Sequence, residues 1–598
     1  MNLIDPSELL NVTNTNGFAG KSLANVLMST LKFNEVNKVY AQNCNKNNLE
    51  FLEAILKDLE VKFDLNDYEL NKLPEAGPFI TVSNHPFGGI DGLLLMKIIS
   101  MKRKDFKLFG NFLLERIVPL QDYILPVNSF ESHKEIKSSV GSLKYAYRHL
   151  AGGHPLGIFP AGEVSSYDEK IVIQDRQWVH STIRFIKNAQ VPVIPIYFHG
   201  SNSILFHLLG MINPKLRTAK LASELFNKKN KKLTIRIGSP ISVAEQNEFT
   251  NIDQYGRFLR AKTYALGSAI EVKKFYHSVL KKMEKPEKIV SQFNKAGIES
   301  EINLLEEKYL LFSSENYKVF CAPYKKIPLT LNEIGRLREI TFREVGEGTN
   351  RSSDLDEFDL YYDHLFIWDD ETKQIVGAYR VGKGKEITKQ FGKKGFYINS
   401  LFKINEKMLP VLQQSIELGR SFVVKEYQKK PASLFLLWKG IIYVLLKNPE
   451  YRYLIGPVSI SSTYSNFSKS LIIDFIKSNY FHPEYAQLIK PRNEFKVNYK
   501  RSDHNIMLSS IKDDISKLDR IIEDIEPSHY KMPILFKKYL KQNAKIIGFN
   551  IDPRFNEALD GLMILDLFDV PLNTIRSLSK ELNDDSIMER FKDNIINY

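Results

Sequence analysis

Short apolar runs alternate with helical patterns between residues 76 and 200. The runs are rich in isoleucine and valine and stop at or just before a proline or histidine; they are 78–84 (PFITVSN), 155–160 (PLGIFP) and 191–198 (VPVIPIYF). This alternation predicts an α/β domain with a mainly parallel sheet and helices on its faces. Because parallel sheets carry their sites at the carboxyl ends of strands, we expect functional residues in the loops that follow these runs.

A second mixed pattern occupies the C-terminal half of the chain. Residues 331–345 have the periodicity of an amphipathic helix, and 364–370 with 373–382 form a predicted β-hairpin. A charged stretch, 270–300, separates the two patterns, and no internal repeat relates them. We therefore predict two different α/β domains, which cover residues 1–290 and 296–598.

Composition and charge narrow the class of protein. Hydrophobic residues make up 43% of the 598, which is enough for packed cores. The 83 basic and 70 acidic residues leave a net charge of +13, which suits an anionic membrane, a nucleic acid or an acidic protein partner. No nucleic-acid-binding motif is present, so we expect no nucleic acid partner. Cys44 and Cys321 fit no metal spacing and are expected to be free thiols in a reducing compartment.

Targeting signals are not evident in the sequence. The N-terminus lacks the basic and apolar segments of a signal peptide. The nearest candidate for a spanning helix, 434–446, falls short of the ~18–20 residues that such a helix needs and contains Lys439. We expect a cytoplasmic protein that is peripheral on the inner face of the cytoplasmic membrane.

The loop 83–92 (SNHPFGGIDG) holds the first candidate site. It follows an apolar strand and precedes a helical run, and it contains His85 and Asp91. A carboxylate that orients one imidazole nitrogen leaves the other as a general base, which can take the proton of a hydroxyl as it attacks a thioester. Asp91 acting only as a helix cap would give the same pattern.

Two further sequence blocks connect this loop to one particular group of enzymes. GIFPAGEVSS (157–166) and VPVIPIYFHG (191–200) follow in the order found in the glycerolipid acyltransferase superfamily, which residues 75–240 resemble. The resemblance implies an acyltransferase with His85 and Asp91 as catalytic residues. It also implies substrate contacts at Asn84, Gly162, Glu163 and Pro195.

The blocks depart from the usual pattern of that superfamily at two points. Five residues separate His85 from Asp91, one more than usual, and no basic residue follows Gly162 before Lys170. In phosphatidic-acid enzymes such a basic residue is thought to hold the acceptor phosphate. Both departures resemble the branch that acylates lyso-aminolipids such as lyso-ornithine and lyso-glycine lipids, so we expect an acceptor without a glycerol phosphate.

The C-terminal half carries a second set of motifs. An acidic segment, 354–359 (DLDEFD), follows the helical pattern, and IELGRSFV (416–423) and LDGLMILDL (559–567) come later. Their order resembles the amino-acid N-acyltransferases that make lyso-ornithine or lyso-glycine lipid, and more distantly the acyl-homoserine lactone synthases, over about 300–570. Both families are relatives of the GNAT acetyltransferase fold.

This second resemblance implies site residues by position: Arg338, Phe342, Asp356, Asp359, Arg380, Glu417 and Arg420. Acidic groups can hold an ammonium, while Arg380 or Arg420 can hold an amino-acid carboxylate. Glu417 is the candidate for the base that takes the amine proton. Structural ion pairs would leave the same residues in the sequence.

The acyl donor is inferred from a missing motif. Acetyltransferases that use coenzyme A usually carry a glycine-rich loop whose amides hold the pyrophosphate. The stretch 382–392 (GKGKEITKQFG) has no good match to such a loop but is rich in lysine. We expect an acidic acyl carrier protein, or else a coenzyme A thioester, as donor, with no metal or resident cofactor; an ordinary lysine-rich loop would look the same.

The combined hypothesis is a bifunctional aminolipid synthase. The C-terminal domain would N-acylate an amino acid, ornithine or glycine, with a 3-hydroxyacyl chain, and the N-terminal domain would O-acylate that lyso lipid through His85 and Asp91. One alternative is a lysophosphatidic-acid or phospholipid acyltransferase with a regulatory C-terminal domain. Another is a non-enzymatic, membrane-binding protein of haemolysin type.

Overall fold

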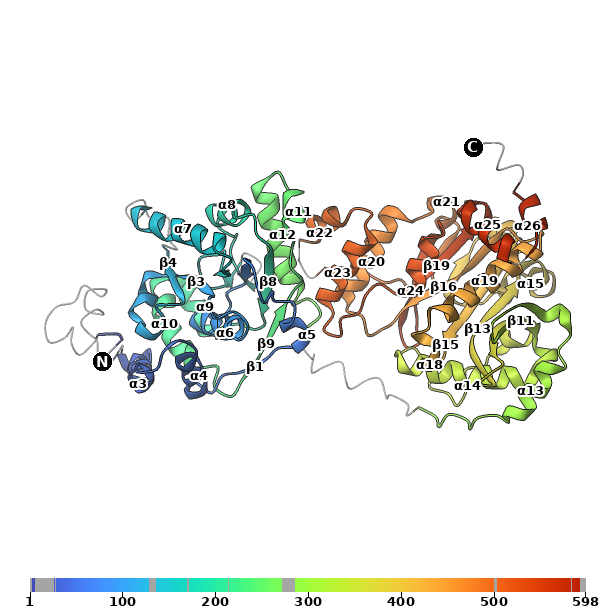
Figure 1. Ribbon diagram of the computed structural model, residues 1–598, viewed down its shortest axis with the longest axis horizontal. Coiled ribbons are helices and arrows are strands. Elements are labelled where there is room, and N and C mark those ends of the chain that lie inside the picture. Colours follow the sequence, from blue (N-terminus) through green and yellow to red (C-terminus); the bar gives the residue numbers. More distant parts are fainter. Residues whose placement is uncertain are drawn as a thin grey trace. The chain divides into compact units, whose positions relative to one another are not determined.

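The computed structural model describes residues 3–5, 26, 28–127, 136–168, 172–212, 214–270, 286–499, 503–581 and 583–591. The chain forms two compact units, which Figure 1 shows in sequence colours. The first contains Met1–Ile270 with Lys500–Ile511 and Arg520–His529, and the second contains Glu271–Tyr499, Lys512–Asp519 and Tyr530–Tyr598. The C-terminal half of the chain thus adds two short segments to the first unit.

The first unit is built on a seven-stranded sheet, and the predicted α/β class is confirmed. Every pair of neighbouring strands is parallel apart from β8 (Val193–Phe198) and β9 (Lys232–Ile237), which run antiparallel. The predicted runs form β2, β5 and β8, which lie side by side in the sheet and end at one edge. The strand order is β1 (Lys62–Asp64), β9 (Lys232–Ile237), β8 (Val193–Phe198), β2 (Ile80–Ser83), β5 (Leu156–Ile158), β3 (Lys107–Gly110) and β4 (Ile124–Pro126).

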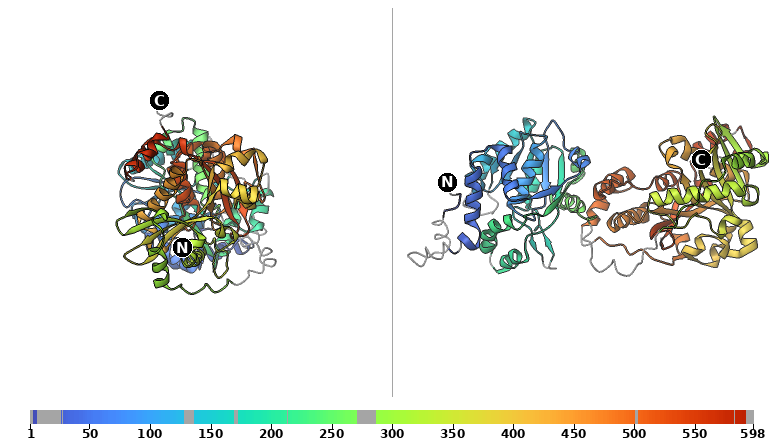
Figure 2. Two further views of the ribbon diagram at one scale, coloured as in Figure 1. Left: turned by 90° about the vertical axis from the view of Figure 1, so that its right-hand side faces the viewer. Right: turned by 90° about the horizontal axis from the view of Figure 1, so that it is seen from below.

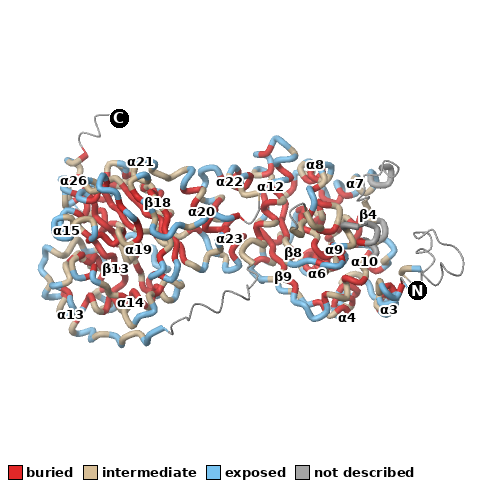
Figure 3. Tube along the Cα trace, turned by 180° about the vertical axis from the view of Figure 1, so that it is seen from behind, coloured by how far each residue is buried: buried red, intermediate tan, exposed pale blue. Residues whose placement is uncertain are grey.

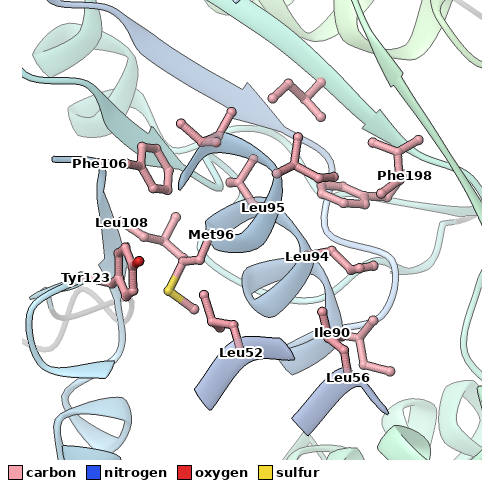
Figure 4. Close-up of a cluster of buried hydrophobic side chains, with 14 of the residues drawn as sticks. Leu52, Leu56, Ile90, Leu94, Leu95, Met96, Phe106, Leu108, Tyr123 and Phe198 are labelled. Carbon is pink, nitrogen blue, oxygen red and sulfur yellow. The ribbon is translucent and has the colours of Figure 1, made fainter. Parts of the chain in front are cut away.

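Helix α6 (Gly89–Ser100) places the first site against the core. Its sequence, GIDGLLLMKIIS, is apolar on nearly every side, and Leu94, Leu95 and Ile99 are fully buried. Figure 4 shows the helix packed among side chains of β3 and of α4 (Asn48–Asp58). Burying each leucine contributes about 1.5–3 kcal/mol, so the start of the helix, where Asp91 lies, is held firmly.

A buried carboxylate holds the segment Arg520–His529, which includes the end of helix α23 (Ile515–Ile525), within the first unit. Asp524 accepts hydrogen bonds from Lys72 Nζ (2.9 Å), Ser239 N (2.9 Å) and Ser239 Oγ (2.7 Å). Arg236 donates to the Asp524 carbonyl oxygen at 2.8 Å. Burial alone would raise the pKa of Asp524, but Lys262 and Lys72 hold it below its ordinary value.

The second unit contains an eight-stranded mixed sheet. The predicted hairpin is confirmed as β12 and β13, and the predicted helix forms α14 (Pro328–Glu344). The neighbouring strands are antiparallel except for β15 and β16. The strand order is β10 (Leu310–Ser314), β11 (Tyr317–Pro323), β12 (Asp363–Asp369), β13 (Gln374–Lys383), β15 (Ser415–Val423), β16 (Tyr453–Ile460), β19 (Ala558–Asp566) and β18 (Lys545–Asp552).

Strands β15 and β16 separate soon after they begin. They pair from Ser415↔Tyr453 to Glu417↔Ile455, whereas both strands continue for several residues beyond. At the point of separation a Cβ on Gly456 would lie 2.2 Å from the Leu418 carbonyl oxygen, so only glycine fits. Arg420, just beyond, has a left-handed backbone (φ 51°), and the pairing of β15 with β13 shifts register there. The sheet is therefore open between β15 and β16 near Arg420.

Helix α19 (Pro431–Lys447) contains the stretch 434–446, the nearest candidate in the sequence for a spanning helix. It packs on β10, β11, β12 and β13, and its Leu437, Ile441 and Leu445 are almost fully buried. Figure 2 shows each unit as a sheet covered by helices, and Figure 3 shows buried residues concentrated in those layers. Within the described ranges, no helix is both long and apolar enough to cross a membrane.

We predict that Asp524→Ala will destabilise the first unit. Removing one partner of a buried ion pair leaves Lys72 and Lys262 without their counter-charge, which costs about 3–5 kcal/mol. Because the pKa of Asp524 is lowered in the folded state, its contribution is full at neutral pH and is lost on acidification. Hydrogen exchange of the β2 and α6 amides measures this unit separately from the other.

The matched control is Asp503→Ala, which removes the surface ion pair between Asp503 and Arg257 (2.7 Å) in the same part of the chain. An exposed pair contributes about 0–1 kcal/mol, so this variant should exchange almost like the wild type. Equal exchange rates in the two variants would contradict the anchoring role of Asp524.

Candidate active sites

The first site begins with a connection between two strand ends. Asn84, directly after β2, donates through Nδ2 to the Phe198 carbonyl oxygen (2.9 Å) and accepts through Oδ1 from Phe198 N (2.8 Å). Its amide thus bonds both backbone groups of Phe198, the last residue of β8. Asn84, predicted as a substrate contact, therefore fixes the starting point of the loop that carries His85.

His85 and Asp91 lie together, as predicted, with 3.0 Å between Nδ1 and Oδ2. The same Asp91 oxygen accepts hydrogen bonds from Phe87 N (2.8 Å) and Gly88 N (3.0 Å). Gly88 has a φ of 84°, which favours glycine and turns the loop back onto the start of α6. Asp91 therefore serves both as a cap of the helix and as the partner of the imidazole.

Exposure distinguishes the two members of this pair. The Asp91 side chain is 0% exposed, whereas the His85 side chain is 18% exposed. Burial raises the pKa of Asp91, and the hydrogen bond and charge of His85 act against that rise. The imidazole is thus the member that a substrate can reach, and the buried carboxylate orients it.

Residues after β5 hold His85 from the other side. The Phe159 ring stacks on the imidazole with centroids 4.1 Å apart, and Ser165 N donates to the His85 carbonyl oxygen (2.9 Å). The His85 backbone N–H donates to Asp175 Oδ1 (3.1 Å), which also accepts from Ser165 Oγ (2.6 Å). Sequence reasoning missed Asp175, which lies in a segment without a motif.

Glu163 is bound by two arginines from other parts of the chain. Arg217 Nη2 donates to Glu163 Oε2 at 2.6 Å, and Arg176 Nε lies 3.2 Å from Oε1. Gly162, just before it, has a left-handed backbone (φ 69°). No basic residue follows Gly162 closely in the sequence, but Arg217 and Arg176, from other parts of the chain, lie next to Glu163 in the structure. That the acceptor has no glycerol phosphate stays a prediction.

Pro195 lies inside β8 rather than in a loop. It pairs with Val82 of β2, and its carbonyl oxygen accepts from Gly238 N at 2.9 Å. A Cβ on Gly238 would come within 2.8 Å of the Pro195 ring. In this structure Pro195 is a packing residue of the sheet.

The predicted charged residues of the second unit form one network. Arg338 binds Asp359 through two hydrogen bonds of 2.9 Å, and both side chains are 1% exposed. Arg380 Nη1 donates to Asp356 Oδ1 at 2.5 Å. Arg420 Nη2 lies 3.5 Å from the other Asp356 oxygen. Phe342, also predicted, packs edge-on against Phe555 nearby, at 5.0 Å between ring centroids.

The arginines keep these buried carboxylates ionised. Burial alone would raise the pKa of Asp359, but Arg338 and Arg380 hold it far below its ordinary range. The pKa of Asp356 is lowered in the same way, with burial opposed by Arg380. The network is therefore charged at neutral pH and has fixed geometry.

Glu417 lies in β15 next to this network and is 1% exposed. Its carboxylate accepts hydrogen bonds from Ile398 N (2.8 Å), Tyr397 N (3.1 Å) and the Tyr362 hydroxyl. Burial raises its pKa to about 7. These bonds fasten the segment around Tyr397 to the sheet; Glu417 as the base stays a prediction.

Sequence reasoning missed a further group at the same end of the sheet. The Tyr397 hydroxyl donates to Asp552 Oδ2 (2.9 Å) and accepts from Arg420 Nη1 (3.2 Å). Asp560 couples electrostatically to Asp552, Glu347 and Arg420. These residues come from four distant segments, and the one local signal was the resemblance of 559–567 to a closing segment.

Family models match two separate parts of the chain. The model described as acyltransferase matches residues 13–273, and the model described as acetyltransferase (GNAT) domain matches residues 337–439. These matches confirm the predicted resemblances of the two halves.

Two curated relatives have names that describe different acylations. A glycine N(alpha)-acyltransferase of Phocaeicola vulgatus is 28% identical over 295 residues, which are 46% of this chain and 88% of that protein. A lyso-glycine lipid O-acyltransferase of Bacteroides thetaiotaomicron is 26% identical over 253 residues, or 41% of this chain and 90% of that protein. The solved 1-acyl-sn-glycerophosphate acyltransferase of Thermotoga maritima is 16% identical with a TM-score of 0.24, covering 39% of this chain and 90% of that one.

The chain thus carries an acyltransferase domain in its N-terminal part and a GNAT domain in its C-terminal part, and it is an acyl-transfer enzyme.

Proposed function

We propose that the protein is a bifunctional aminolipid synthase that acylates an amino acid first on nitrogen and then on oxygen. The observation that carries this proposal is the joining of the two domains in one chain with relatives named for N-acylation of glycine and O-acylation of lyso-glycine lipid. These names favour glycine over ornithine as the amino acid. The first product would carry a 3-hydroxyacyl chain, whose hydroxyl is the acceptor for the second reaction.

His85 is the general base of the proposed O-acylation. Its exposed nitrogen takes the proton of the lyso-lipid hydroxyl as the oxygen attacks the thioester carbon, and Asp91 stabilises the imidazolium that forms. The carbon–oxygen bond forms, the carbon–sulfur bond breaks, and the proton passes to the thiolate. Because Asp91 is fully buried and accepts hydrogen bonds from Phe87 N and Gly88 N, it can hold the orientation of the imidazole through this cycle.

The N-acylation site lies where β15 and β16 separate. The gap leaves unpaired strand edges beside Arg380 and Arg420, where an extended acyl thioester can lie against the sheet. Arginine suits the planar carboxylate of an amino acid because it donates two parallel hydrogen bonds. The acidic side chains nearby suit the ammonium group.

Membrane contact follows from the nature of the product, which is amphipathic. Helix α9 (Ile204–Ile212) follows the strand that anchors Asn84 and exposes Ile204 (69%), Leu205 (55%) and Leu208 (47%). An apolar helix face of this kind can enter the interfacial layer of a bilayer. We propose that the protein works at the inner face of the cytoplasmic membrane, where lyso lipid can pass between the domains without entering water.

The acyl donor of the N-acylation is proposed to be an acyl carrier protein. Residues 424–430 (VKEYQKK), between β15 and α19, contain no glycine, and Pro431 removes an N–H from the first turn of α19. A pyrophosphate would find few backbone donors there. On α15 (Gly384–Phe391) and directly after it, Lys385, Lys389 and Lys394 are exposed and suit an acidic carrier.

We predict that His85→Ala abolishes O-acylation and spares N-acylation, because the pair belongs to one domain. Lipid mass spectrometry of a heterologous host should show N,O-diacylated amino acid with the wild type and mono-acylated lyso lipid with the variant. His180→Ala is the control, since His180 is 50% exposed and pairs with Asp253 on the surface.

Other lipid profiles contradict the proposal. Changed phospholipid chains without any acylated amino acid would identify a phospholipid acyltransferase with a regulatory C-terminal domain. An unchanged lipid profile would contradict the synthase proposal altogether. Normal diacylated lipid from His85→Ala would remove His85 as the base.

We predict that reversing Lys385, Lys389 and Lys394 to glutamate raises the KM for 3-hydroxyacyl carrier protein by roughly 10-fold and changes kcat less, because steering acts on association. Lys383 is left unchanged because it pairs with Asp363 at 2.9 Å. Wild-type kcat/KM should fall as salt shortens the Debye length below ~8–10 Å. Efficient use of 3-hydroxyacyl coenzyme A, unaffected by salt or by the reversals, would contradict the carrier.

A further inference from the structure

A buried histidine without a hydrogen-bond partner lies on helix α9 of the first unit. His207 is 2% exposed, and among the described residues neither Nδ1 nor Nε2 of its ring has a partner. Leu205 and Leu208 of the same helix are exposed, so His207 points away from the face that we propose to meet the membrane. Its ring lies 5.1 Å from that of Tyr167, measured between centroids. Because an unpaired buried polar group is costly, this imidazole is a candidate for contact with a ligand.

Arg217 packs against the same side of α9. It belongs to α10 (Pro214–Phe226), and a Cβ on Gly210 of α9 would lie 2.7 Å from its Cδ. Gly210 follows His207 by three residues, and residues three apart lie on one face of a helix. The Arg217 side chain is 10% exposed and half encloses the end of that face. The side of α9 that carries the unpaired imidazole therefore also carries a guanidinium group.

Helix α10 brings Arg217 to the loop that contains His85. A Cβ on Gly88, in that loop, would lie 2.8 Å from Leu221 Cδ2. Leu221 follows Arg217 by four residues, so the two side chains share one face of α10. Residues spaced in this way lie about 5–6 Å apart between their Cβ atoms. Arg217 is therefore next to a side chain that touches the loop of the proposed base.

The segment after β5 brings His207 to the same loop. Ser165 N donates to the His85 carbonyl oxygen (2.9 Å), and Tyr167, which contacts His207, lies two residues further in the short strand β6 (Ser166–Tyr167). This contact is independent of the one that α10 makes. Two separate sets of contacts thus place His207 and Arg217 beside the proposed site of O-acylation.

The charged side chains at this place match one monovalent anion. Glu163 lies 2.6 Å from Arg217 and 3.2 Å from Arg176, so the three side chains carry one more positive than negative charge. Lys228 and Glu224, which are also close, lie 3.9 Å apart and compensate each other. A carboxylate would make the group neutral. A phosphate monoester, with a charge of about −1.5 to −2, would make it negative.

An N-acylated amino acid offers groups that match both features. Its carboxylate can accept two parallel hydrogen bonds from a guanidinium. Burial lowers the pKa of His207, so its imidazole is neutral near pH 7 and has one N–H to donate. The amide carbonyl oxygen of the lyso lipid can accept that hydrogen bond. A glycerophosphate has neither the carboxylate nor the amide.

We propose that Arg217, Arg176 and His207 form the binding site for the headgroup of the lyso lipid in the O-acylation. The two arginines bind the carboxylate, and His207 binds the amide carbonyl, so that the 3-hydroxyl of the acyl chain can approach His85. The inference rests on the proposed function. It adds specificity residues from outside the three sequence blocks, which select an N-acylated amino acid over a glycerophosphate.

The test for Arg217 compares O-acylation of N-(3-hydroxyacyl)glycine and of its methyl ester by the full-length protein. Wild type should prefer the free acid by roughly 10- to 100-fold in kcat/KM, the range expected for hydrogen bonds to a charged group. Arg217→Gln should lose most of this preference through a higher KM for the acid, with little change for the ester. Arg217→Lys should keep part of it. A merely structural role of Arg217 would slow both acceptors equally.

The test for His207 uses a third acceptor, a hydroxy acid in which two methylene groups replace the amide. His207→Phe keeps a ring in place but removes its N–H. It should raise the KM for N-(3-hydroxyacyl)glycine by roughly 2- to 10-fold, as expected for one neutral hydrogen bond, and leave the KM for the methylene analogue unchanged. An equal effect on both acceptors would contradict the amide contact.

Arg184→Gln is the matched control, because Arg184 lies on α8 (His180–Asn188) and contacts His180 on the surface. It should keep every preference of the wild type. N-acylation of glycine by the same samples should be unchanged in all variants, which shows that the second unit is intact.

Two outcomes separate this inference from the proposed function. If wild type acylates the acid and the ester equally well, or Arg217→Gln keeps the full preference, the inference is wrong while the proposed function stands. If wild type acylates lysophosphatidic acid but no acylated glycine, the proposed function is wrong and this inference with it.

Discussion

Asp91 is removed from water and yet tied to the one side chain it must orient, and the first site depends on that pairing. A buried carboxylate is costly unless donors surround it, and here two backbone N–H groups and the His85 imidazole supply them. The helix that carries Asp91 is fixed by its apolar faces, so core packing sets the position of the carboxylate. Asn84 sets the other end of the loop by joining two strands. The stability of this unit and its proposed catalysis thus depend on the same contacts.

The second unit also depends on a buried carboxylate that is surrounded by hydrogen-bond donors. The Arg338–Asp359 pair is fully buried and doubly hydrogen-bonded, and it holds the acidic segment against the sheet. Arg380 and Arg420 are then positioned by Asp356 and Asp354 from that segment. Nε and Nη2 of Arg380 have no acceptor among the described residues and lie 3.9 Å from the Cβ position of Gly419 in β15. In the proposed function, this buried ion-pair network positions the arginines that would bind the amino-acid carboxylate.

Sequence reasoning was most successful where residues that act together are close in the chain. The strand-then-loop pattern predicted the parallel sheet, and the loop 83–92 contains the whole His85–Asp91 pair. It failed where contacts join distant segments. Asp175 and Arg217 reach the first site from outside the motif blocks, and Asp552 and Arg420 meet at the Tyr397 hydroxyl from two distant strands. The sequence also gives no sign that the segment with Asp524 belongs to the first unit, because a single buried carboxylate produces no periodic pattern.

The most direct measurement follows both acylations in one reaction with the purified full-length protein. Isotope-labelled glycine is supplied with a 3-hydroxyacyl thioester and a second acyl thioester, and labelled products are followed by mass spectrometry over time. If the protein is a bifunctional synthase, labelled mono-acylated lyso lipid should appear first, and labelled N,O-diacylated lipid should follow after a lag. Label that never enters lipid, or lyso lipid that accumulates without any diacylated product, would contradict the assignment of two sequential acylations to this chain.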